Sequence, residues 1–327
     1  MQDLHVSFPT AKGRLHAVRG ISFDVKKGQV FGVVGESGCG KTATGRALMR
    51  LVPSPGRIDQ GSILYRGEDL LAKSDAAMRD LRGRHISMVF QDPATALNPV
   101  FTVGQQLSYI IRRHGMATGR AVRQRAIDLL GELGLPSPVD MLDRYPHQLS
   151  GGMQQRVMLS LALAADPNMI IADEATTALD VTIQAQIVEL LLRLRRDRGL
   201  TIIFITHDLG LVAEICDYVA VLYMGRIVEE GDTDSIFHDT RHPYTRGLLS
   251  ALPSDKTWGT PLTVIPGSVP TATGIMPGCS FAPRCPQAMT ICQTTGPGTT
   301  AFTTTHSAEC HLYSSEQFCR PREVRDA

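Results

Sequence analysis

Eight consecutive residues near the start of the chain have the composition of a loop that binds phosphate. The segment Gly35-Glu36-Ser37-Gly38-Cys39-Gly40-Lys41-Thr42 matches the pattern G-x4-G-K-[ST]. Glycines allow backbone N–H groups to turn inward around phosphate oxygens, Lys41 adds a positive charge, and the Thr42 hydroxyl can ligate Mg²⁺. A flexible glycine turn would explain the glycines but neither Lys41 nor Thr42. The pattern therefore predicts a binding site for a nucleoside triphosphate and Mg²⁺.

Two adjacent carboxylates follow an apolar stretch in the middle of the chain. Residues 169–172 predict a short buried strand, and Asp173 and Glu174 come directly after it. An ATPase with such a phosphate loop needs a carboxylate at a strand end for the Mg²⁺ coordination shell, and a group that orients or deprotonates the attacking water. Asp-Glu pairs also occur at solvated strand ends. The phosphate loop upstream favours the functional interpretation, in which Asp173 helps to coordinate Mg²⁺ and Glu174 orients or deprotonates the attacking water.

A second possible anion site lies between these two segments. Ser150-Gly151-Gly152 opens a stretch of helical periodicity. A serine hydroxyl, free backbone N–H groups and the helix dipole together favour an anion, although a well-capped helix would have the same sequence.

Composition narrows the class of protein. The 327 residues are 43% hydrophobic and 20% charged, with a formal net charge of +1, which gives no electrostatic argument for nucleic acid or an anionic membrane as partner. No stretch approaches the roughly 20 apolar residues of a membrane-spanning helix, and the first residues lack the pattern of a secretion signal. Any membrane pore must therefore come from other subunits.

Apolar periodicity predicts the elements that position these residues. We expect strands at 4–8, 21–25, 30–34, 62–65, 85–90, 169–172 and 201–206, helices at 43–51, 122–133 and 184–196, and a hairpin formed by 219–224 and 227–229. Residues from about 92 to 149 have a helical pattern. Beyond about residue 232 the composition shifts toward Pro, Gly, Thr and Cys, which indicates a separate extension.

The segment Leu149-Ser150-Gly151-Gly152-Met153-Gln154-Gln155-Arg156 resembles the signature motif of ABC ATPases. Gln91 resembles the Q-loop glutamine of that family, Ala178-Leu179-Asp180 its D-loop, and His207 its switch histidine. The resemblance implies an α/β fold: a P-loop (RecA-like) ABC ATPase core with an antiparallel β subdomain, a helical signature subdomain and a small cysteine-rich C-terminal extension. We expect an ATPase domain at 1–231, with the helical subdomain at about 92–158, and the extension at 232–327.

In that family ATP lies between two ATPase subunits. The resemblance implies that Glu174, His207 and Gln91 act in catalysis, and that Thr42, Gln91 and Asp173 hold Mg²⁺. For the aromatic residue that stacks on adenine in this family, Phe8 is the first candidate and His16 the second. The implied nucleotide-binding residues, some of them serving the partner's ATP, are Gly35, Glu36, Ser37, Gly38, Cys39, Gly40, Lys41, Thr42, Thr44, Ser150, Gly151, Gly152 and Asp180.

Longer segments resemble the oligopeptide and dipeptide (peptide/nickel) importer branch. They are Gln91-Asp92-Pro93, Tyr145-Pro146-His147-Gln148, His242-Pro243-Tyr244-Thr245 and Arg284-Cys285-Pro286. This resemblance implies ATP-driven uptake of peptides, or of a related solute such as nickel. It also implies a second, different ATPase subunit, two membrane permeases, an extracytoplasmic solute-binding protein, and a peripheral position at the cytoplasmic face of the inner membrane.

Five of the seven cysteines lie in the last fifty residues. Cys279, Cys285, Cys292 and Cys310 are separated by five, six and seventeen residues, and four thiolates suit either Zn²⁺ or a [4Fe–4S] cluster. The spacing lacks the tight pairs of structural zinc sites, so both it and the resemblance favour a cluster. His311 leaves a mixed-ligand zinc site open, Cys319 is expected to be a spare, and four unligated thiols are the remaining alternative.

Three other functions compete with transport. A soluble ABC ATPase acting on ribosomes or DNA usually has two cassettes or a long coiled-coil insertion, and the sequence shows neither. An exporter would normally carry a fused membrane span. A metal or redox sensor would explain the cysteines but not the phosphate loop and its associated motifs.

Overall fold

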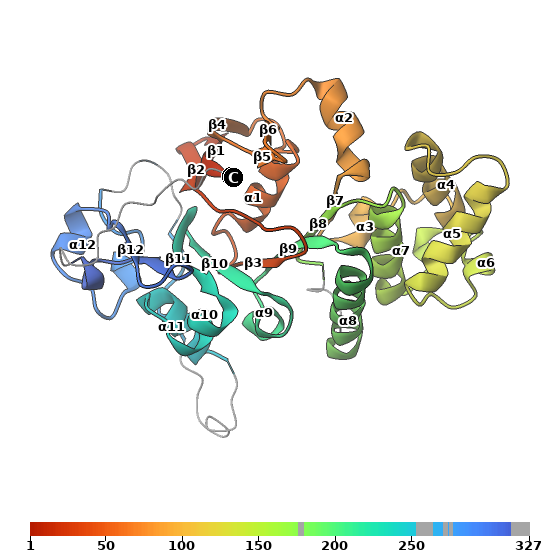
Figure 1. Cartoon of the computed structure of the whole chain (residues 1–327). Helices are drawn as coiled ribbons and strands as arrows, with labels where there is room; N and C mark the ends of the chain where they lie inside the picture. Colours follow the sequence, from red (N-terminus) through yellow and green to blue (C-terminus); the bar gives the residue numbers. More distant parts are fainter. Residues whose placement is uncertain (176–179, 253–263, 271–273, 275–276, 315–327) are drawn as a thin grey trace. The chain divides into compact units, whose positions relative to one another are not determined.

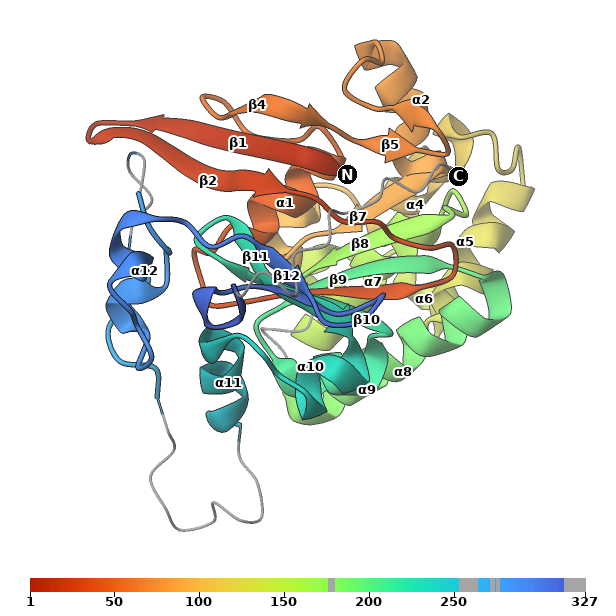
Figure 2. The same ribbon diagram turned by 60° about the vertical axis from the view of Figure 1, so that its left-hand side comes forward.

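The computed structural model describes residues 1–175, 180–252, 264–270, 274 and 277–314, which fall into two compact units. The first unit comprises Met1–Asp24, Phe31–Glu68 and His207–Ala327, and the second comprises Val25–Val30 and Asp69–Thr206. Each unit therefore combines segments that are distant in the sequence (Figures 1 and 2).

The first unit begins with a three-stranded antiparallel sheet in the order β2-β1-β4. Its strands are β1 (Gln2–Thr10), β2 (Gly13–Ile21) and β4 (Arg57–Ser62). The register pairs Phe8 with Leu15 across the hairpin. The short strands β5 (Leu64–Tyr65) and β6 (Glu68–Asp69) pair separately.

A second sheet in this unit has the order β12-β13-β11-β10-β3. The strand β3 (Val30–Val34) is fully buried and pairs in parallel with β10 (Tyr218–Tyr223), which forms a hairpin with β11 (Arg226–Asp232). Two strands of the C-terminal extension, β12 (Thr299–Ala301) and β13 (Ser307–Glu309), continue this sheet beyond β11. The unit's helices are α1 (Lys41–Leu48), α9 (Leu209–Ile215), α10 (Thr233–His238), α11 (Pro243–Ser250), α12 (Ile291–Thr294), and the 3-10 helices η3 (Ala282–Arg284) and η4 (His311–Tyr313).

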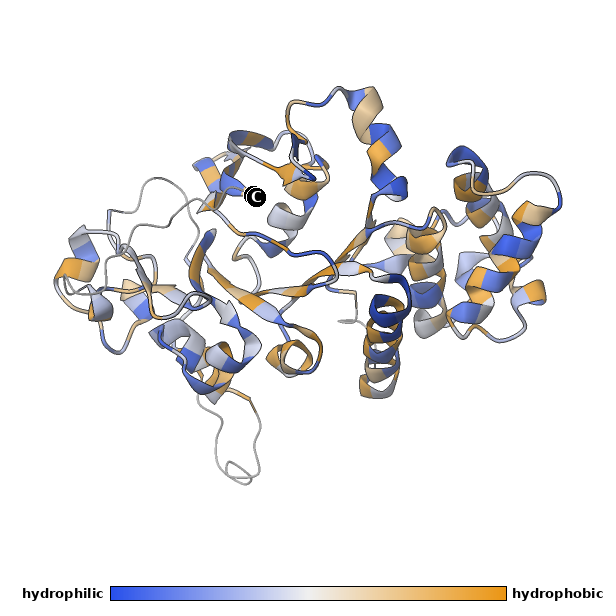
Figure 3. Cartoon of the chain, in the orientation of Figure 1, coloured by the Kyte–Doolittle hydropathy of each residue, from blue (hydrophilic) through white to orange (hydrophobic). Residues whose placement is uncertain are grey.

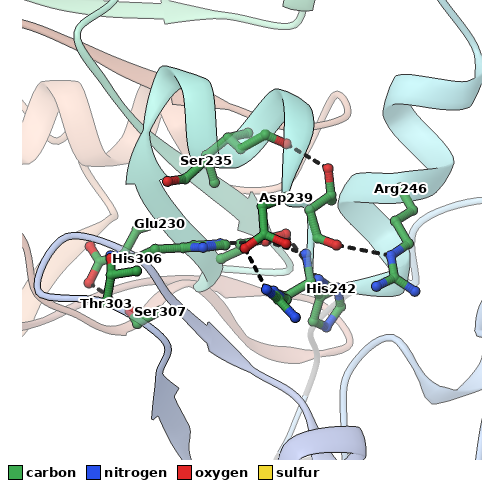
Figure 4. Close-up of polar contacts among 12 residues, drawn as sticks. Glu230, Ser235, Asp239, His242, Arg246, Thr303, His306 and Ser307 are labelled. Carbon is green, nitrogen blue, oxygen red and sulfur yellow. Dashed lines mark hydrogen bonds and ion pairs between the residues drawn. The ribbon is translucent and has the colours of Figure 1, made fainter.

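A buried carboxylate joins the extension to this sheet. Glu229 of β11 has no solvent exposure, and its carboxylate accepts the backbone N–H groups of Arg241 at 2.6 Å and His242 at 3.0 Å. Nε2 of His306, just before β13, lies 2.9 Å from the same carboxylate. The backbone N–H of His242 and the ring of His306 thus contact the carboxylate of Glu229 from two separate segments of the chain. Both histidines are labelled in Figure 4. A buried polar group with several such partners holds its segments together, because removing a partner leaves a buried hydrogen-bonding group unsatisfied.

The second unit places three parallel strands beside a group of helices. Its strands have the order β9-β8-β7, with bounds β7 (Ile86–Val89), β8 (Met169–Asp173) and β9 (Thr201–Thr206). Its helices are α2 (Asp75–Arg84), α3 (Pro93–Ala96), α4 (Val103–Arg113), α5 (Ala121–Glu132), α6 (Pro138–Met141), η1 (Pro146–Gln148), α7 (Gly151–Leu163) and α8 (Val181–Arg198). Figure 3, which is coloured by hydropathy, shows hydrophilic residues at one end of α8. Three arginines occupy the last turn of this helix.

Most of the predicted elements are confirmed, with shifted ends. The strands predicted at 30–34 and 201–206 coincide with β3 and β9, and the predicted hairpin is formed by β10 and β11. The strand predicted at 21–25 is wrong, because the strand in this region is β2, which ends at Ile21. Phe23 is buried all the same, and its N–H donates to the carbonyl of Met1. The apolar pattern at residues 21–25 therefore indicates a buried segment that is not a strand.

Helices in the described part of the chain are either too short or too polar to cross a membrane.

Candidate nucleotide-binding site

The predicted phosphate loop folds around the side chain of its lysine. The loop joins β3 to α1, and Lys41 is only 4% exposed at the first position of that helix. Its Nζ donates to the carbonyls of Gly35 at 2.7 Å and Glu36 at 3.1 Å. Thr44 is also buried, with its hydroxyl donating to Gly40 O at 3.0 Å. The ammonium group is thus fixed inside the loop, next to the N-terminal end of a helix, where a phosphate is favoured.

Two glycines of the loop are required by the backbone. Gly35 has φ +150° and Gly40 has φ +108°, a region that side chains rarely adopt. A Cβ would lie 2.2 Å from the carbonyl oxygen of Leu222 at position 35, and 2.3 Å from that of Ala17 at position 40. Gly40 is the N-cap of α1 and offers no side chain to cap it. The residues present therefore fit a phosphate group: a glycine backbone, a helix start without a side-chain cap, and a buried ammonium.

The side chain of Cys39 faces the protein interior. It is fully buried, and burial raises the pKa of its thiol, although the nearby Lys41 opposes the rise. Its carbonyl accepts the N–H of Gly225 at 2.8 Å. Cys39 is thus a buried, protonated side chain that helps to pack the loop.

Two predicted catalytic residues meet in the second unit. Nε2 of Gln91 donates to a carboxylate oxygen of Glu174 at 2.6 Å. Asp173 ends β8 and is 1% exposed, and Glu174 follows it at 8% exposure. The Glu174 N–H donates to the carbonyl of Ile205 on β9, which fixes the backbone of this residue at the strand end.

Glu174 also has an unusual backbone conformation, with φ +47°. A residue other than glycine in this left-handed region is uncommon, and such strain concentrates at functional sites. The end of β8 thus carries two consecutive buried carboxylates, Asp173 predicted to hold a metal and Glu174 to act on a water molecule.

The predicted signature segment starts a helix. Ser150 is the N-cap of α7, and its hydroxyl accepts the N–H of Met153. Ser150 and Gly151 are exposed, and no atom lies within 4 Å of a Cβ built at Gly151. Gly152 is close to the side chain of Ile183, so its lack of a side chain is a packing requirement.

Three further predicted residues occupy separate positions. Asp180 is the exposed N-cap of α8, and its carboxylate accepts the N–H of Ile183 at 2.9 Å. The other two residues of the predicted D-loop, Ala178 and Leu179, lie outside the described part of the chain. His207 is exposed directly after β9. Phe8 is half-buried on β1, with its ring so close to Gly56 that a Cβ there would lie 2.2 Å away.

The predicted metal site in the extension is wrong. Among the residues that the structure describes, no three or more His, Cys, Asp and Glu side chains are grouped so that they could hold a metal ion. This excludes both the [4Fe–4S] cluster and the zinc site expected at Cys279, Cys285, Cys292 and Cys310. Burial raises the pKa of the Cys310 thiol to about 11, and also raises those of Cys279 and Cys285. Cys319 lies outside the described residues.

Sequence analysis named Tyr244 and Arg284 only as parts of segments that resemble the peptide-importer branch, and missed their contact with the phosphate loop. Tyr244 and Arg284 both bind Glu36, from 208 and 248 residues further along the chain. A periodic pattern cannot reveal a pairing at such a distance.

Comparisons with known proteins agree with this geometry. Residues 18–177 match the family model described as ABC transporter, and residues 228–292 match the model described as oligopeptide/dipeptide transporter, C-terminal region. The chain is 47% identical over 313 residues to the dipeptide transport ATP-binding protein DppD of Bacillus subtilis, covering 95% of this chain and 93% of that protein. It is 46% identical over 321 residues to the protein of the same name in Escherichia coli, covering 98% of each.

Solved structures show the same fold. The ATP-binding cassette MJ0796, in a dimeric post-hydrolysis state bound to ADP and Pi, matches with a TM-score of 0.64 at 25% identity, covering 71% of this chain and 97% of that one. The protein cbiO1 from Clostridium perfringens matches with a TM-score of 0.60 at 28% identity, covering 73% of this chain and 92% of that one. The predicted ABC ATPase fold is therefore confirmed, and the chain belongs to the ATP-binding subunits of oligopeptide and dipeptide ABC transporters.

Proposed function

We propose that this chain binds MgATP and hydrolyses it as one of two ATPase subunits that power the uptake of peptides through a membrane transporter. The observation that carries the proposal is the loop from Gly35 to Thr42, folded around a buried lysine at the start of a helix. The relatives named for dipeptide transport support the choice of peptides as the solute. ATP and Mg²⁺ are the ligands expected of this family, whose importer members act as ATPase dimers with membrane permeases.

In this proposal the first unit supplies the phosphate site. Backbone N–H groups of residues 35–42 and the Lys41 ammonium bind the phosphates. The Thr44 hydroxyl stabilises the loop through its hydrogen bond to Gly40 O. By the family resemblance, Thr42, Gln91 and Asp173 are the residues proposed as Mg²⁺ ligands, and Mg²⁺ would neutralise phosphate charge. Phe8 would stack on the adenine ring.

The second unit supplies the group that acts on water. Glu174 accepts a proton from the attacking water, or orients it, and Gln91 holds the carboxylate through the hydrogen bond that its side-chain amide donates. His207, which belongs to the first unit, is proposed to contact the reacting phosphate.

We further propose that Ser150, Gly151, Gly152 and Asp180 contact ATP bound to the partner subunit. The exposed start of α7 and the open space at Gly151 support this, because a site that serves a partner must be accessible before association. The structures of MJ0796 are dimeric. A different chain as the partner follows from the resemblance to the peptide-importer branch.

A hollow in the helical part of the second unit supports docking on the permeases. It has a volume of about 1200 Å³ and is lined by residues that include Phe101, Gln105 and Tyr109. Phe101 and Tyr109 are large, exposed side chains, 48% and 70% accessible, as expected of a surface that a partner covers. The chain would then act at the cytoplasmic face of the membrane, with the solute-binding protein on the other side and no nucleic acid partner. The proposed domains are 1–231, with a helical part at about 92–158, and 232–327.

The experiment is reconstitution. The chain is co-expressed with its partner ATPase and the two permeases, placed in proteoliposomes with the solute-binding protein, and assayed for ATP-dependent uptake of a labelled dipeptide. We expect uptake to require MgATP and to be lost in Lys41→Ala. ATP hydrolysis by a chain that never co-purifies with permeases would favour a soluble non-transport ATPase instead.

A further inference from the structure

The second residue of the phosphate loop is held by the C-terminal extension. Nη1 and Nη2 of Arg284 donate to the two carboxylate oxygens of Glu36 at 2.7 and 3.0 Å. The backbone N–H of Glu36 donates to the hydroxyl of Tyr244 at 2.9 Å. Both the side chain and the main chain of Glu36 are thus bound by residues that lie beyond the hairpin of β10 and β11.

Arg284 is itself fixed in place. Its side chain is 4% exposed, and Nε donates to the carbonyl of Pro266 at 2.9 Å. Nη2 also donates to the carbonyls of Ile265 and Gly267. A guanidinium held by several backbone oxygens loses little further freedom when it binds a carboxylate in a two-pronged geometry. Arg284 therefore positions Glu36 more rigidly than a surface arginine could.

Tyr244 is held by a cluster of buried rings. It has no solvent exposure, and its ring lies edge-on to Tyr223 at 4.6 Å and tilted against Phe281 at 5.3 Å. Tyr223 in turn contacts the Arg284 guanidinium, both through its hydroxyl and through its ring. The hydroxyl of Tyr244 and the guanidinium of Arg284 therefore belong to one packed assembly in the first unit.

Glu36 transmits this positioning to the lysine. The carbonyl of Glu36 accepts a hydrogen bond from Nζ of Lys41 at 3.1 Å, next to the bond from the same Nζ to Gly35. Arg284 and Tyr244 fix the residue whose carbonyl orients the ammonium group. Arg284 also neutralises a carboxylate that stands in the loop where anionic phosphates are proposed to bind.

We infer that Arg284 and Tyr244 are positioning residues for nucleotide binding, so that the affinity of this subunit for MgATP depends on its folded extension. The inference rests on the proposed function, since it concerns the same phosphate site. Without Arg284, the Glu36 carboxylate is an uncompensated negative charge beside the phosphates and the loop loses one of its two anchors. Arg284 acts through Glu36 on Lys41, which is proposed to bind phosphate and not to act on the attacking water, so Kd and KM should change more than kcat.

A purely structural role for Arg284 is the competing explanation, and the chain offers a matched control. Arg226 and Glu309 form a similar two-pronged pair, at 2.9 and 3.1 Å, between β11 and β13 of the same unit. Neither belongs to the phosphate loop. Glu309→Gln breaks a comparable ion pair in the extension without touching Glu36.

The experiment measures the Kd of MgATP for the full-length chain by calorimetry, together with KM and kcat in the assembled transporter. We expect Arg284→Gln to raise Kd and KM about tenfold, the scale of one charge-assisted hydrogen bond, with kcat changed less than about twofold. Tyr244→Phe, which keeps the ring and removes the hydroxyl, should raise Kd by a smaller factor of about three. Glu309→Gln should leave Kd unchanged.

The double variant Glu36→Gln/Arg284→Gln decides whether charge pairing is the cause. Removing both charges should restore much of the affinity that Arg284→Gln loses, so the two effects should not add. The inference is overturned if Arg284→Gln stays folded and binds MgATP with the same Kd as Glu309→Gln. It is also overturned if the changes in binding free energy of the two single variants simply add in the double variant. If the wild-type chain fails to bind MgATP, or Lys41→Ala binds it equally well, the proposed function has failed instead.

Discussion

The amide of Gln91 donates a hydrogen bond of 2.6 Å to the carboxylate of Glu174, directly after the strand β8. The two residues are 83 positions apart in the sequence, and both come from the second unit. This contact fixes the side chain of the proposed base through a single hydrogen bond from a neutral amide. A substitution at either residue should therefore lower the rate of ATP hydrolysis more than it lowers the free energy of unfolding.

Glu174→Gln tests this directly. The amide oxygen of the variant can still accept the Gln91 hydrogen bond, while the basic carboxylate is removed. We expect hydrolysis to slow by roughly 10²-fold or more, with ATP binding kept and the closed ATP-bound dimer accumulating. Turnover is measured by phosphate release and dimerisation by light scattering. Glu189→Gln, which removes an exposed carboxylate on α8, is the control, and near-normal turnover in Glu174→Gln contradicts the assignment.

Gly151→Asp tests the shared site. The position is exposed at the first turn of α7, with open space for a side chain, and an acidic residue there suits the helix dipole. The variant should fold with unchanged stability and bind ATP as an isolated chain. In the assembled transporter its carboxylate should repel the partner's phosphates and reduce hydrolysis by about tenfold or more. Gly151→Ala, which adds no charge, should retain most of the activity; equal activity of the Asp variant in the complex would falsify the shared-site model.

Features of the fold and the site that depend on neighbouring residues could be predicted from the sequence, whereas contacts between distant residues could not. The buried strands β3 and β9 were predictable because both are short apolar runs rich in β-branched side chains, which favour a strand over a helix. The contact between Arg284 and Glu36 was not, because it spans 248 residues and leaves no periodic signal. The metal prediction failed because it extrapolated from cysteine spacing, which says nothing of how the thiols are oriented or buried. The roles of the site residues remain predictions, although their contacts within each unit are now defined.

Cys39 offers a chemical test of the loop. Its thiol is fully buried with a raised pKa, so it should resist iodoacetamide in the folded chain and react once the chain is unfolded. Cys285 is only half-buried and should be alkylated first. Mass spectrometry of tryptic peptides over time measures both rates. Rapid modification of Cys39 in the native chain, at a rate matching Cys285, would show that the loop is open.

The buried ring of His242 should make the free energy of unfolding depend on pH. Burial lowers its pKa from 6.5 to about 4, with Arg246 adding to the fall and Glu229 opposing it. Its Nδ1 accepts the N–H of Tyr244, which requires the neutral ring. The unfolded chain binds this proton at higher pH than the folded chain, so the contribution of His242 is complete above pH 6.5 and is lost as pH falls toward 4. The loss amounts to about 3 kcal/mol in the free energy of unfolding.

The measurement is chemical denaturation between pH 4 and 8. His242→Asn keeps an oxygen that can cap α11 but does not titrate, so it should reduce the fall in stability across this range. His238→Asn is the matched control, because the side chain of His238 is 77% exposed. If the His242 variant follows the same pH curve as the wild-type chain, its burial does not set the acid response.

The pairing of β13 with β11 has a practical consequence for any shortened form of this chain. Cutting the chain after Asp232 would keep every predicted catalytic motif, yet it would uncover the β11 backbone along Glu229 and Glu230, which now pair with Ala308 and Ser307. An exposed strand of this kind is a template for joining other chains. It would also leave Glu229 without His306. A minimal cassette made in this way should form soluble aggregates during purification, and a longer boundary beyond Tyr313 is the better choice for expression.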